Sequence, residues 1–423
     1  MPPLEPFSSQ SMVDSKVVTT SNDNDNDNLD NNYRDNNNIN NRNKDNKDNK
    51  DDNKDNKDYY DYKDDKSVFT KYDVPKITEI RKIFPNKYFH SSVLKSFQYV
   101  IWDLSIVTIL FVSYLYIDSN PNIPLFLKTF VVLPIYTFSQ GTMLWSIFVL
   151  GHDCGHGSFS KYNLLNDTVG TFLHTILLVP YTNWKLSHRH HHKNTSNIDK
   201  DEVFFPLKKS EKQEKMPSSK VAPYFGLGFG WLIYLLIGYG PRATSHINPF
   251  DPLFEKNRLG AIISLTSVII ALCLLSYGSM IWGMITIIKY YFLPWLVFSS
   301  WLVITTFLHH HGAEENVKLP WFINEEWSYV VGNLSSVDRN YGILHGITHN
   351  IGTHQVHHLF PVIPHYYLKE TTKIFQSTYP QFIRESNEPI MNTFISTFKL
   401  WKSQYLIDDD TRIFVYDKNK KQK

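Results

Sequence analysis

Cysteine is scarce in this chain: its 423 residues contain only two, Cys154 and Cys273. Cys154 lies inside a histidine-rich motif and Cys273 inside a long apolar run, so the two are not placed to pair. We therefore expect no disulfide. We interpret Cys154 as a small packing residue rather than a metal ligand.

An excess of charge of one sign is also missing. Lysine and arginine number 43 and aspartate and glutamate 41, and a net charge of +2 indicates no nucleic-acid partner. The N-terminus has no apolar stretch behind basic residues, so we expect no cleaved secretory signal. The mean hydropathy of −0.30 is low because a very polar tail is averaged with a very apolar body.

The polar tail is distinct in composition. Residues 21–66 are almost entirely Asn, Asp and Lys, without hydrophobic periodicity. Such a segment cannot bury enough apolar surface to offset the entropy lost on ordering. We expect residues 1–71 to be a disordered N-terminal tail, a solvated extension in preference to a binding tail. Residues 72–408 are expected to form one membrane domain, and residues 409–423 a basic C-terminal tail.

Histidine is plentiful, and much of it falls in three clusters. The first cluster is H-D-C-G-H at residues 152–156, the second is H-R-H-H-H at 188–192, and the third is H-Q-V-H-H at 354–358. Helical geometry places positions i, i+3 and i+4 on one face, so each cluster can aim two or three imidazoles at one point. The H-x-x-H-H spacing should occur by chance roughly 0.03 times in a chain this rich in histidine, yet it occurs twice. Eight nitrogen ligands exceed the four of a closed zinc site, which favours two metal ions over a structural zinc.

Four apolar runs are long enough to cross a bilayer. They are residues 97–117, 130–150, 259–277 and 290–308. Residues 164–181 and 224–240 are ambiguous, and since all three clusters must reach the same side, we expect both to lie in the interface or to re-enter. Residues 281–288 are expected at the far surface. Lys and Arg gather on the histidine side, which predicts that this side and both termini are cytosolic.

Several motifs carry a resemblance to a known family. They are H-D-C-G-H-G-S-F at 152–159, L-V-P-Y at 178–181, S-H-R-H-H-H at 187–192, D-E-V-F at 201–204, L-P-W at 319–321, D-R-N-Y-G at 338–342 and H-H-L-F-P at 357–361. Over roughly residues 74–401 the chain resembles the membrane fatty acyl desaturases, and within them the methyl-end group of omega-3 and Delta-12 enzymes. His354 stands where front-end desaturases usually have Gln, and the H-P-G-G motif of a fused cytochrome b5 domain is absent.

The resemblance implies an all-α integral membrane protein, with about four transmembrane helices and a cytosolic helical cap that holds a histidine-ligated di-iron site. It implies two iron ions (Fe2+/Fe3+) as cofactor and O2 as co-substrate, which is reduced to water as a cis double bond forms in an acyl chain. It also implies a separate cytochrome b5 and its NADH-dependent reductase as electron donors. The expected location is the endoplasmic reticulum membrane, and Lys420-Lys421-Gln422-Lys423 resembles a dilysine retrieval signal.

By the same resemblance, the metal ligands are eight histidines of the three clusters and one near the end of the last span. They are His152, His156, His188, His191, His192, His310, His354, His357 and His358. His349 is the alternative to His310, and His190 is left out because it occupies the variable position of the second cluster. Five further histidines are interpreted as structural: His90, His174, His246, His345 and His365.

Ligating imidazoles usually donate their second N–H to an acceptor. The acidic residues of the neighbouring motifs, Asp201, Glu202 and Asp338, are the candidates for this role.

The position of the new double bond is predicted by motif likeness. The first cluster, H-H-H-G at 309–312 and W-S-Y at 327–329 resemble omega-3 enzymes, whereas D-E-V-F at 201–204 resembles the Delta-12 group. We expect conversion of linoleoyl to alpha-linolenoyl chains esterified in phospholipid, with a Delta-12 or bifunctional enzyme as the alternative. A di-iron hydroxylase or acetylenase also fits the scaffold. A histidine-rich metal transporter is disfavoured, because transporters place such ligands near the middle of their spans.

Overall fold

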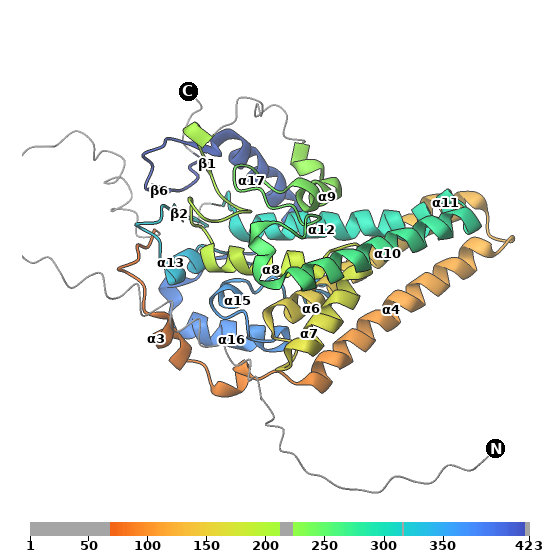
Figure 1. Ribbon diagram of the computed structural model, residues 1–423, viewed down its shortest axis with the longest axis horizontal. Helices are drawn as coiled ribbons and strands as arrows, with labels where there is room; N and C mark the ends of the chain where they lie inside the picture. Colours follow the sequence, from red (N-terminus) through yellow and green to blue (C-terminus); the bar gives the residue numbers. More distant parts are fainter. Residues whose placement is uncertain (1–67, 212–222, 315–316, 419–423) are drawn as a thin grey trace, which may run out of the picture. The chain divides into compact units, whose positions relative to one another are not determined.

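The computed structural model describes residues 68–211, 223–314 and 317–418 (Figure 1). The polar tail at 21–66 and the lysine motif at 420–423 lie outside these residues. Within them, four helices are long and apolar enough to cross a membrane: Val93–Ser119, Leu125–His156, Pro252–Trp282 and Met284–His310. The expectation of a mainly helical protein with about four such helices is therefore confirmed.

The first long helix is α4 (Val93–Ser119) and the third is α10 (Arg258–Trp282), which the 3-10 turn η6 (Pro252–Asn257) precedes. The second and fourth are each built from three segments that run on from one another. These segments are α5 (Leu125–Leu127), η2 (Lys128–Val132) and α6 (Leu133–His156), and α11 (Met284–Ile287), η7 (Ile288–Phe292) and α12 (Leu293–His310). Residues 281–288 thus turn between the third and fourth helices at Gly283 and then join the fourth.

The second and fourth long helices share a local feature: each has a π-helical turn directly before a Leu-Pro pair. Pro134 and Pro294 have no N–H to donate, and their rings crowd the carbonyl four residues earlier. A π-helical turn makes room for the ring without ending the helix. The carbonyl that Pro294 leaves free, that of Tyr290, accepts a 2.8 Å hydrogen bond from the Tyr136 hydroxyl.

An ion pair joins the two helical hairpins at the end opposite the histidine clusters. Lys289 Nζ lies 2.7 Å from Asp118 Oδ2, and the Tyr290 hydroxyl donates to the same oxygen at 2.9 Å. Lys128 donates to the backbone carbonyl of Asp118 at 2.7 Å. The charges of Asp118 and Lys289 thereby offset each other at this end of the bundle.

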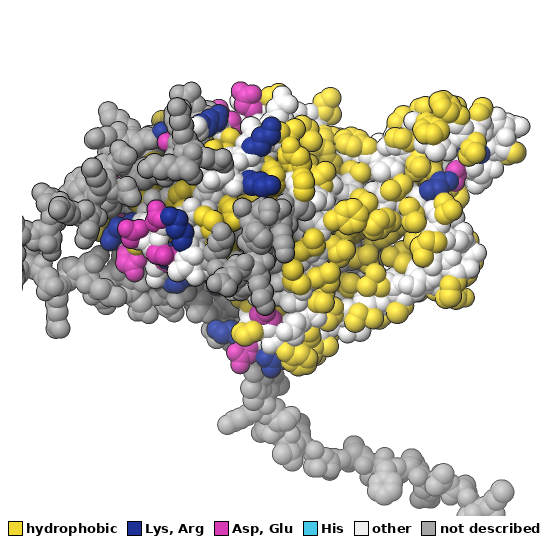
Figure 2. All heavy atoms as spheres, turned by 90° about the horizontal axis from the view of Figure 1, so that it is seen from above, with side chains coloured by type: hydrophobic (Ala, Val, Ile, Leu, Met, Phe, Trp, Pro, Cys, Tyr) yellow, Lys and Arg dark blue, Asp and Glu magenta, His cyan; other side chains and the backbone are white. Residues whose placement is uncertain are grey.

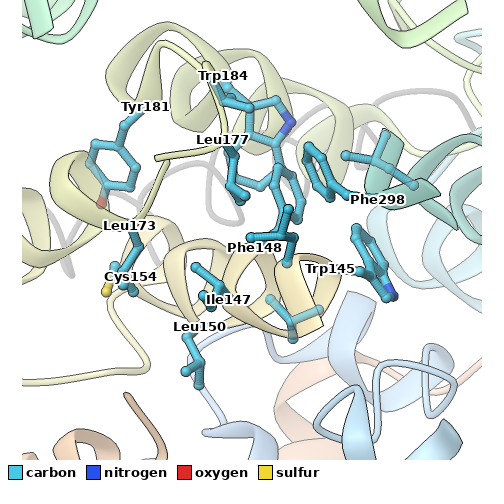
Figure 3. Packing of buried hydrophobic residues seen from close by; sticks show 14 of the residues in the cluster. Trp145, Ile147, Phe148, Leu150, Cys154, Leu173, Leu177, Tyr181, Trp184 and Phe298 are labelled. Carbon is cyan, nitrogen blue, oxygen red and sulfur yellow. The ribbon is translucent and has the colours of Figure 1, made fainter. Parts of the chain in front are cut away.

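The helices α6 and α12 are central, and α4 and α10 lie outside them. In the apolar 18-residue stretch of each long helix, 50% of the stretch is buried in the second helix and 56% in the fourth. In the first and third helices the buried share is 17%. Trp145 and Phe148 of α6 pack with Phe298 of α12 and Trp184 in the main hydrophobic core (Figure 3). On the outside, hydrophobic side chains cover the surface of the long helices (Figure 2).

Shorter elements gather at the end of the long helices where the histidine clusters lie (Figure 1). The helices are α3 (Ile77–Lys82), α7 (Asn163–Thr175), α8 (Tyr181–Asn194), α9 (Gly228–Ile237), α13 (Tyr329–Leu334), α14 (Leu344–Ile347), α15 (Gln355–Leu359), α16 (His365–Thr378) and α17 (Ile390–Gln404), with 3-10 turns η1 (Asn86–Phe89), η3 (Lys209–Glu211), η5 (Pro223–Gly226) and η8 (Pro380–Phe382). The helices in the two ambiguous segments, α7 and α9, have 13 and 10 residues. Neither is long enough to cross a bilayer, which takes about 20.

Strands are short and tie distant parts of the chain together in pairs. The parallel pairs are β1 (Leu207–Lys208) with β5 (Leu406–Ile407) and β3 (Asp338–Arg339) with β4 (Glu385–Ser386), and the antiparallel pair is β2 (Trp321–Phe322) with β6 (Ile413–Phe414). The pair β3–β4 positions Asp338 beside the third histidine cluster.

The close approach of α6 and α12 depends on Gly141. A Cβ atom at this position would lie 2.5 Å from the Pro294 carbonyl oxygen and from Val297 Cβ. We expect Gly141→Val to force the helices apart and to lower the free energy of unfolding by about 1–3 kcal/mol. Thermal unfolding in detergent measures this, and Ile135→Val, at a position 63% exposed on the same helix, is the control. Equal melting temperatures for the two variants would contradict the packing argument.

Candidate metal centre

The first cluster occupies the C-terminal end of α6. Gly157, at φ +75, ends the helix directly after His156 in the left-handed conformation that glycine adopts without cost. His152 and His156, one turn apart, face the same way, and their Nε2 atoms are 3.2 Å apart. Both side chains are buried.

The second cluster lies on α8 and points in two directions. His188 and His192 face the first cluster, with their Nε2 atoms 3.1 Å apart. His191 faces α12, and its Nε2 lies 3.1 Å from that of His310. The His190 ring instead contacts the Lys200 carbonyl at 3.0 Å and belongs to neither group of clustered imidazoles.

The third cluster lies on the one-turn helix α15 and on the residue before it. Asp338 accepts the backbone N–H groups of His354 at 2.6 Å and Gln355 at 2.8 Å, so its carboxylate satisfies donors that the start of a helix leaves free. His354 Nε2 lies 3.3 Å from His310 Nε2. His357 contacts the first cluster instead, with its ring centroid 4.7 Å from that of His152.

Two groups of imidazoles result among the residues that the structure describes. In each, one nitrogen per residue lies within 4.8 Å of all the others. The five-histidine group is His152, His156, His188, His192 and His357, and the three-histidine group is His191, His310 and His358. The groups are adjacent, since the His192 and His358 rings stack with centroids 4.0 Å apart. His354 joins the second group through His310.

This donor set fits two metal ions. The Nε2 atoms of His357 and His358 are buried and have no hydrogen-bond partner among the described residues, so both are free to bind a cation. Burial holds the pKa values of His192, His354, His357 and His358 well below the ordinary value. These imidazoles are therefore neutral at pH 7, which is the form that binds metal. Neutral imidazole suits iron.

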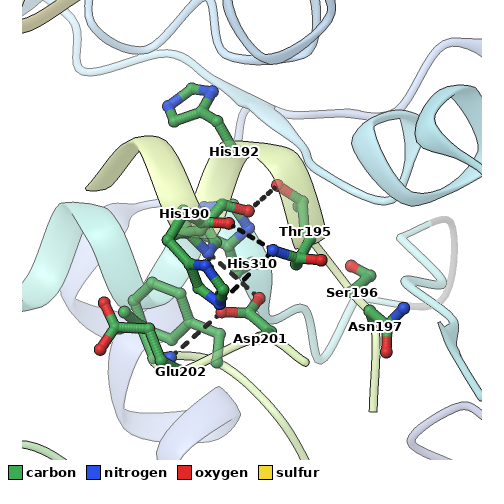
Figure 4. A network of polar contacts seen from close by, with 12 residues as sticks. His190, His192, Thr195, Ser196, Asn197, Asp201, Glu202 and His310 are labelled. Atoms are coloured by element: carbon green, nitrogen blue, oxygen red, sulfur yellow. Dashed lines mark hydrogen bonds and ion pairs between the residues drawn. The ribbon is translucent and has the colours of Figure 1, made fainter. Parts of the chain in front are cut away.

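The three acidic candidates have different positions. Asp201 lies 3.0 Å from His191 Nδ1, where it can accept the ring N–H and leave Nε2 to face the site (Figure 4). Asp338 acts on the third cluster through the backbone, as described above. Glu202 contacts no histidine of either group: it accepts hydrogen bonds from the Ser187 and Tyr234 hydroxyls, and burial raises its pKa to about 7.

Sequence reasoning missed two acceptors. His358 Nδ1 lies 3.0 Å from Asn333 Oδ1, on α13, and no sequence pattern marks Asn333 as its partner. Asp153 lies within the first cluster, so its place in the motif was a usable signal. Its carboxylate contacts His365 Nδ1 at 2.9 Å and lies 3.5 Å from His152 Nδ1.

The alternative ninth ligand lies elsewhere. His349 Nε2 contacts Asp103 Oδ2 at 2.7 Å, so it belongs to neither group, whereas His310 lies between His191 and His354. The five histidines interpreted as structural also lie outside both groups: His90, His174, His246, His345 and His365.

The comparisons with known proteins agree on one family. A family model described as fatty acid desaturase matches residues 128–386. A Nostoc sp. (strain 36) protein named sn-1 acyl-lipid omega-3 desaturase (ferredoxin) is 36% identical over 350 residues, 82% of this chain and 92% of the relative. An omega-3 fatty acid desaturase, endoplasmic reticulum, of Vigna radiata var. radiata is 40% identical over 76% of this chain and 83% of the relative. The Arabidopsis thaliana acyl-lipid omega-3 desaturase (cytochrome b5), endoplasmic reticulum, is 39% identical over 73% of this chain and 78% of the relative.

Neighbouring histidines on α8 offer a matched test of the centre. His191→Ala removes a ring that faces His310, whereas His190→Ala removes a ring that faces Lys200. We expect wild-type protein to carry about two irons per chain. Loss of His191 should weaken metal retention by about tenfold or more, as loss of even an indirect partner of a metal ligand does. Elemental analysis after a chelator challenge measures this, and equal retention by both variants would refute the assignment of His191.

Proposed function

Because this chain belongs to the fatty acid desaturase family, we propose that it introduces the omega-3 double bond into linoleoyl chains carried by membrane lipids. Family membership confirms the resemblance drawn from the histidine motifs and makes the chain an oxidoreductase that desaturates acyl chains. The observation that carries the proposal is the pair of adjacent imidazole groups at the ends of α6 and α12. We assign residues 72–408 to the desaturase domain, residues 1–71 to an N-terminal tail and residues 409–423 to a basic C-terminal tail.

We assign the eight histidines of the two groups and His354, nine in all, as ligands of two iron ions. When bound, the irons supply the activation of O2 and the removal of two hydrogens from neighbouring methylenes. The protein's part is to hold the imidazoles in place. Asp201 orients His191, Asp338 orients the backbone of the third cluster, and Asn333 orients His358.

A second task of the protein is to keep bulk water from the centre. The histidines of the three-histidine group and His354 are at most 6% exposed. Exclusion of water would limit side reactions during the oxidation of an acyl chain at this site. The His309 ring stacks on the His354 ring, with centroids 3.9 Å apart, and so covers one side of it. The Nε2 atom of His309 is hydrogen-bonded to the Tyr341 hydroxyl at 2.6 Å.

The finer points of substrate and partners rest on the names of relatives and on sequence motifs. The Nostoc and Arabidopsis proteins are named as acyl-lipid omega-3 enzymes, which supports a lipid-esterified chain and the omega-3 position. The first is named with ferredoxin and the second with cytochrome b5 and the endoplasmic reticulum. We propose cytochrome b5 and its NADH-dependent reductase as donors, the endoplasmic reticulum as the membrane, and the cytosol as the side that the histidine clusters face.

Regiochemistry can be tested in a yeast that makes oleate but no polyunsaturated chains. We expect alpha-linolenate to appear only when linoleate is fed, and His357→Ala to make none, because His357 belongs to the five-histidine group. Gas chromatography of total lipid measures both acids. Linoleate formed without feeding, and no alpha-linolenate with it, would place the enzyme in the Delta-12 group, and both products would make it bifunctional.

The electron donor can be tested in the same host. In a strain without cytochrome b5, we expect the alpha-linolenate fraction to fall about tenfold, because the irons must be reduced in each cycle. Returning cytochrome b5 should restore it. Restoration by ferredoxin and its reductase, but not by cytochrome b5, would contradict the proposed donor.

A further inference from the structure

A cavity of about 390 Å³ lies between the two long helices α4 and α6. Its walls include Trp102 and Ile106 of α4 and Phe138 of α6, and residues 344–349 close its inner end. Trp102 is 66% exposed and Phe138 50% exposed, so the cavity opens on the outer side of both helices. We call it the α4–α6 crevice.

The inner end of the crevice is held by a buried polar cluster. Asp103, 1% exposed, lies in α4 at a depth where a charged side chain needs a partner. Its Oδ2 lies 2.7 Å from His349 Nε2 and accepts a 2.7 Å hydrogen bond from the Ser146 hydroxyl. His349 has a φ of +54, an unfavourable conformation for a residue other than glycine that surrounding contacts must maintain. The cluster therefore fixes the segment that carries Leu344.

Leu344 stands between the crevice and the metal centre. It lines the crevice and also a smaller void, whose other walls include Trp145, Trp301 and Tyr341. The Tyr341 hydroxyl is 2.6 Å from His309, and the His309 ring stacks on that of His354. A continuous series of contacts thus leads from the lipid-facing side of α4 and α6 to the three-histidine group.

We propose that the α4–α6 crevice is the binding site through which the acyl chain of a bilayer lipid reaches the metal centre, with Leu344 as the side chain that it must pass. The occupant follows from the surroundings: the walls are predominantly apolar and belong to two helices that can cross a membrane, where hydrocarbon tails are the medium. This inference rests on the proposed function, in that it takes a lipid-esterified chain as the substrate.

Two positions on α4 provide a matched pair of variants. Ile106→Trp places bulk inside the crevice, whereas Ile109→Trp makes the same change at a position 63% exposed on the same helix. The full-length protein is reconstituted in vesicles of phosphatidylcholine whose sn-2 chain carries a terminal diazirine, and labelled peptides are identified by mass spectrometry. We expect label on α4 and α6 in the wild type. Ile106→Trp should lower that label about fivefold and lower alpha-linolenate formation in yeast in proportion, and Ile109→Trp should change neither.

Leu344 can be tested separately from the crevice. Leu344→Trp should keep the crevice label but lower alpha-linolenate formation about tenfold, because the chain binds and cannot pass. The control is Ile343→Trp, at the neighbouring position, which is 89% exposed. Retained iron content in each variant shows that the metal centre is intact.

The outcomes separate the crevice from the proposed function. Equal label in Ile106→Trp and Ile109→Trp overturns the crevice as a binding site, whatever the activity. Lost label with full activity also overturns it as an access route, since it then holds only a structural lipid. If the wild type makes no desaturated product but Ile106→Trp still loses the label, the crevice stands as a lipid site and the proposed function fails.

Discussion

The structure depends on one constraint: many neutral imidazoles must converge in a buried space. Each lone pair that faces the centre gives up hydrogen bonding to water, so it needs a partner of another kind. The protein meets this by ending its two most buried long helices, α6 and α12, at the centre and by bringing α8 and α15 against them. Four helices thus hold one set of imidazoles, and the position of each helix end matters.

The apolar part of the molecule serves this arrangement. Because α6 and α12 must approach closely, a glycine lies at their contact and small irregularities are absorbed by π-helical turns before Pro134 and Pro294. The more exposed helices α4 and α10 pack outside this pair and present hydrophobic side chains outward. The Asp118–Lys289 pair joins the two helical hairpins at the far end of the bundle.

Hydrogen bonds to the clustered histidines come from many parts of the chain. Asp201 follows α8 by a few residues, Asp338 comes from a two-residue strand, and Asn333 from α13. A ring fixed by such an acceptor presents one tautomer to the centre and cannot rotate away. Asp103 and His349 extend the same principle into the membrane-facing part, where their contact fixes the segment ahead of the third cluster.

The sequence by itself determined the local features. The spacing of each cluster sets which imidazoles share a helical face, and the apolar runs predicted four long helices, because both follow from helical geometry and side-chain transfer energy alone. Only the tertiary structure divided the second cluster, sending His191 to one group and His188 to the other, and placed His310 rather than His349 at the centre. It also placed Glu202 against Ser187 and Tyr234 and not against an imidazole of either group. These contacts join residues far apart in the chain, so the packing of whole helices decides them. No local sequence pattern encodes that packing.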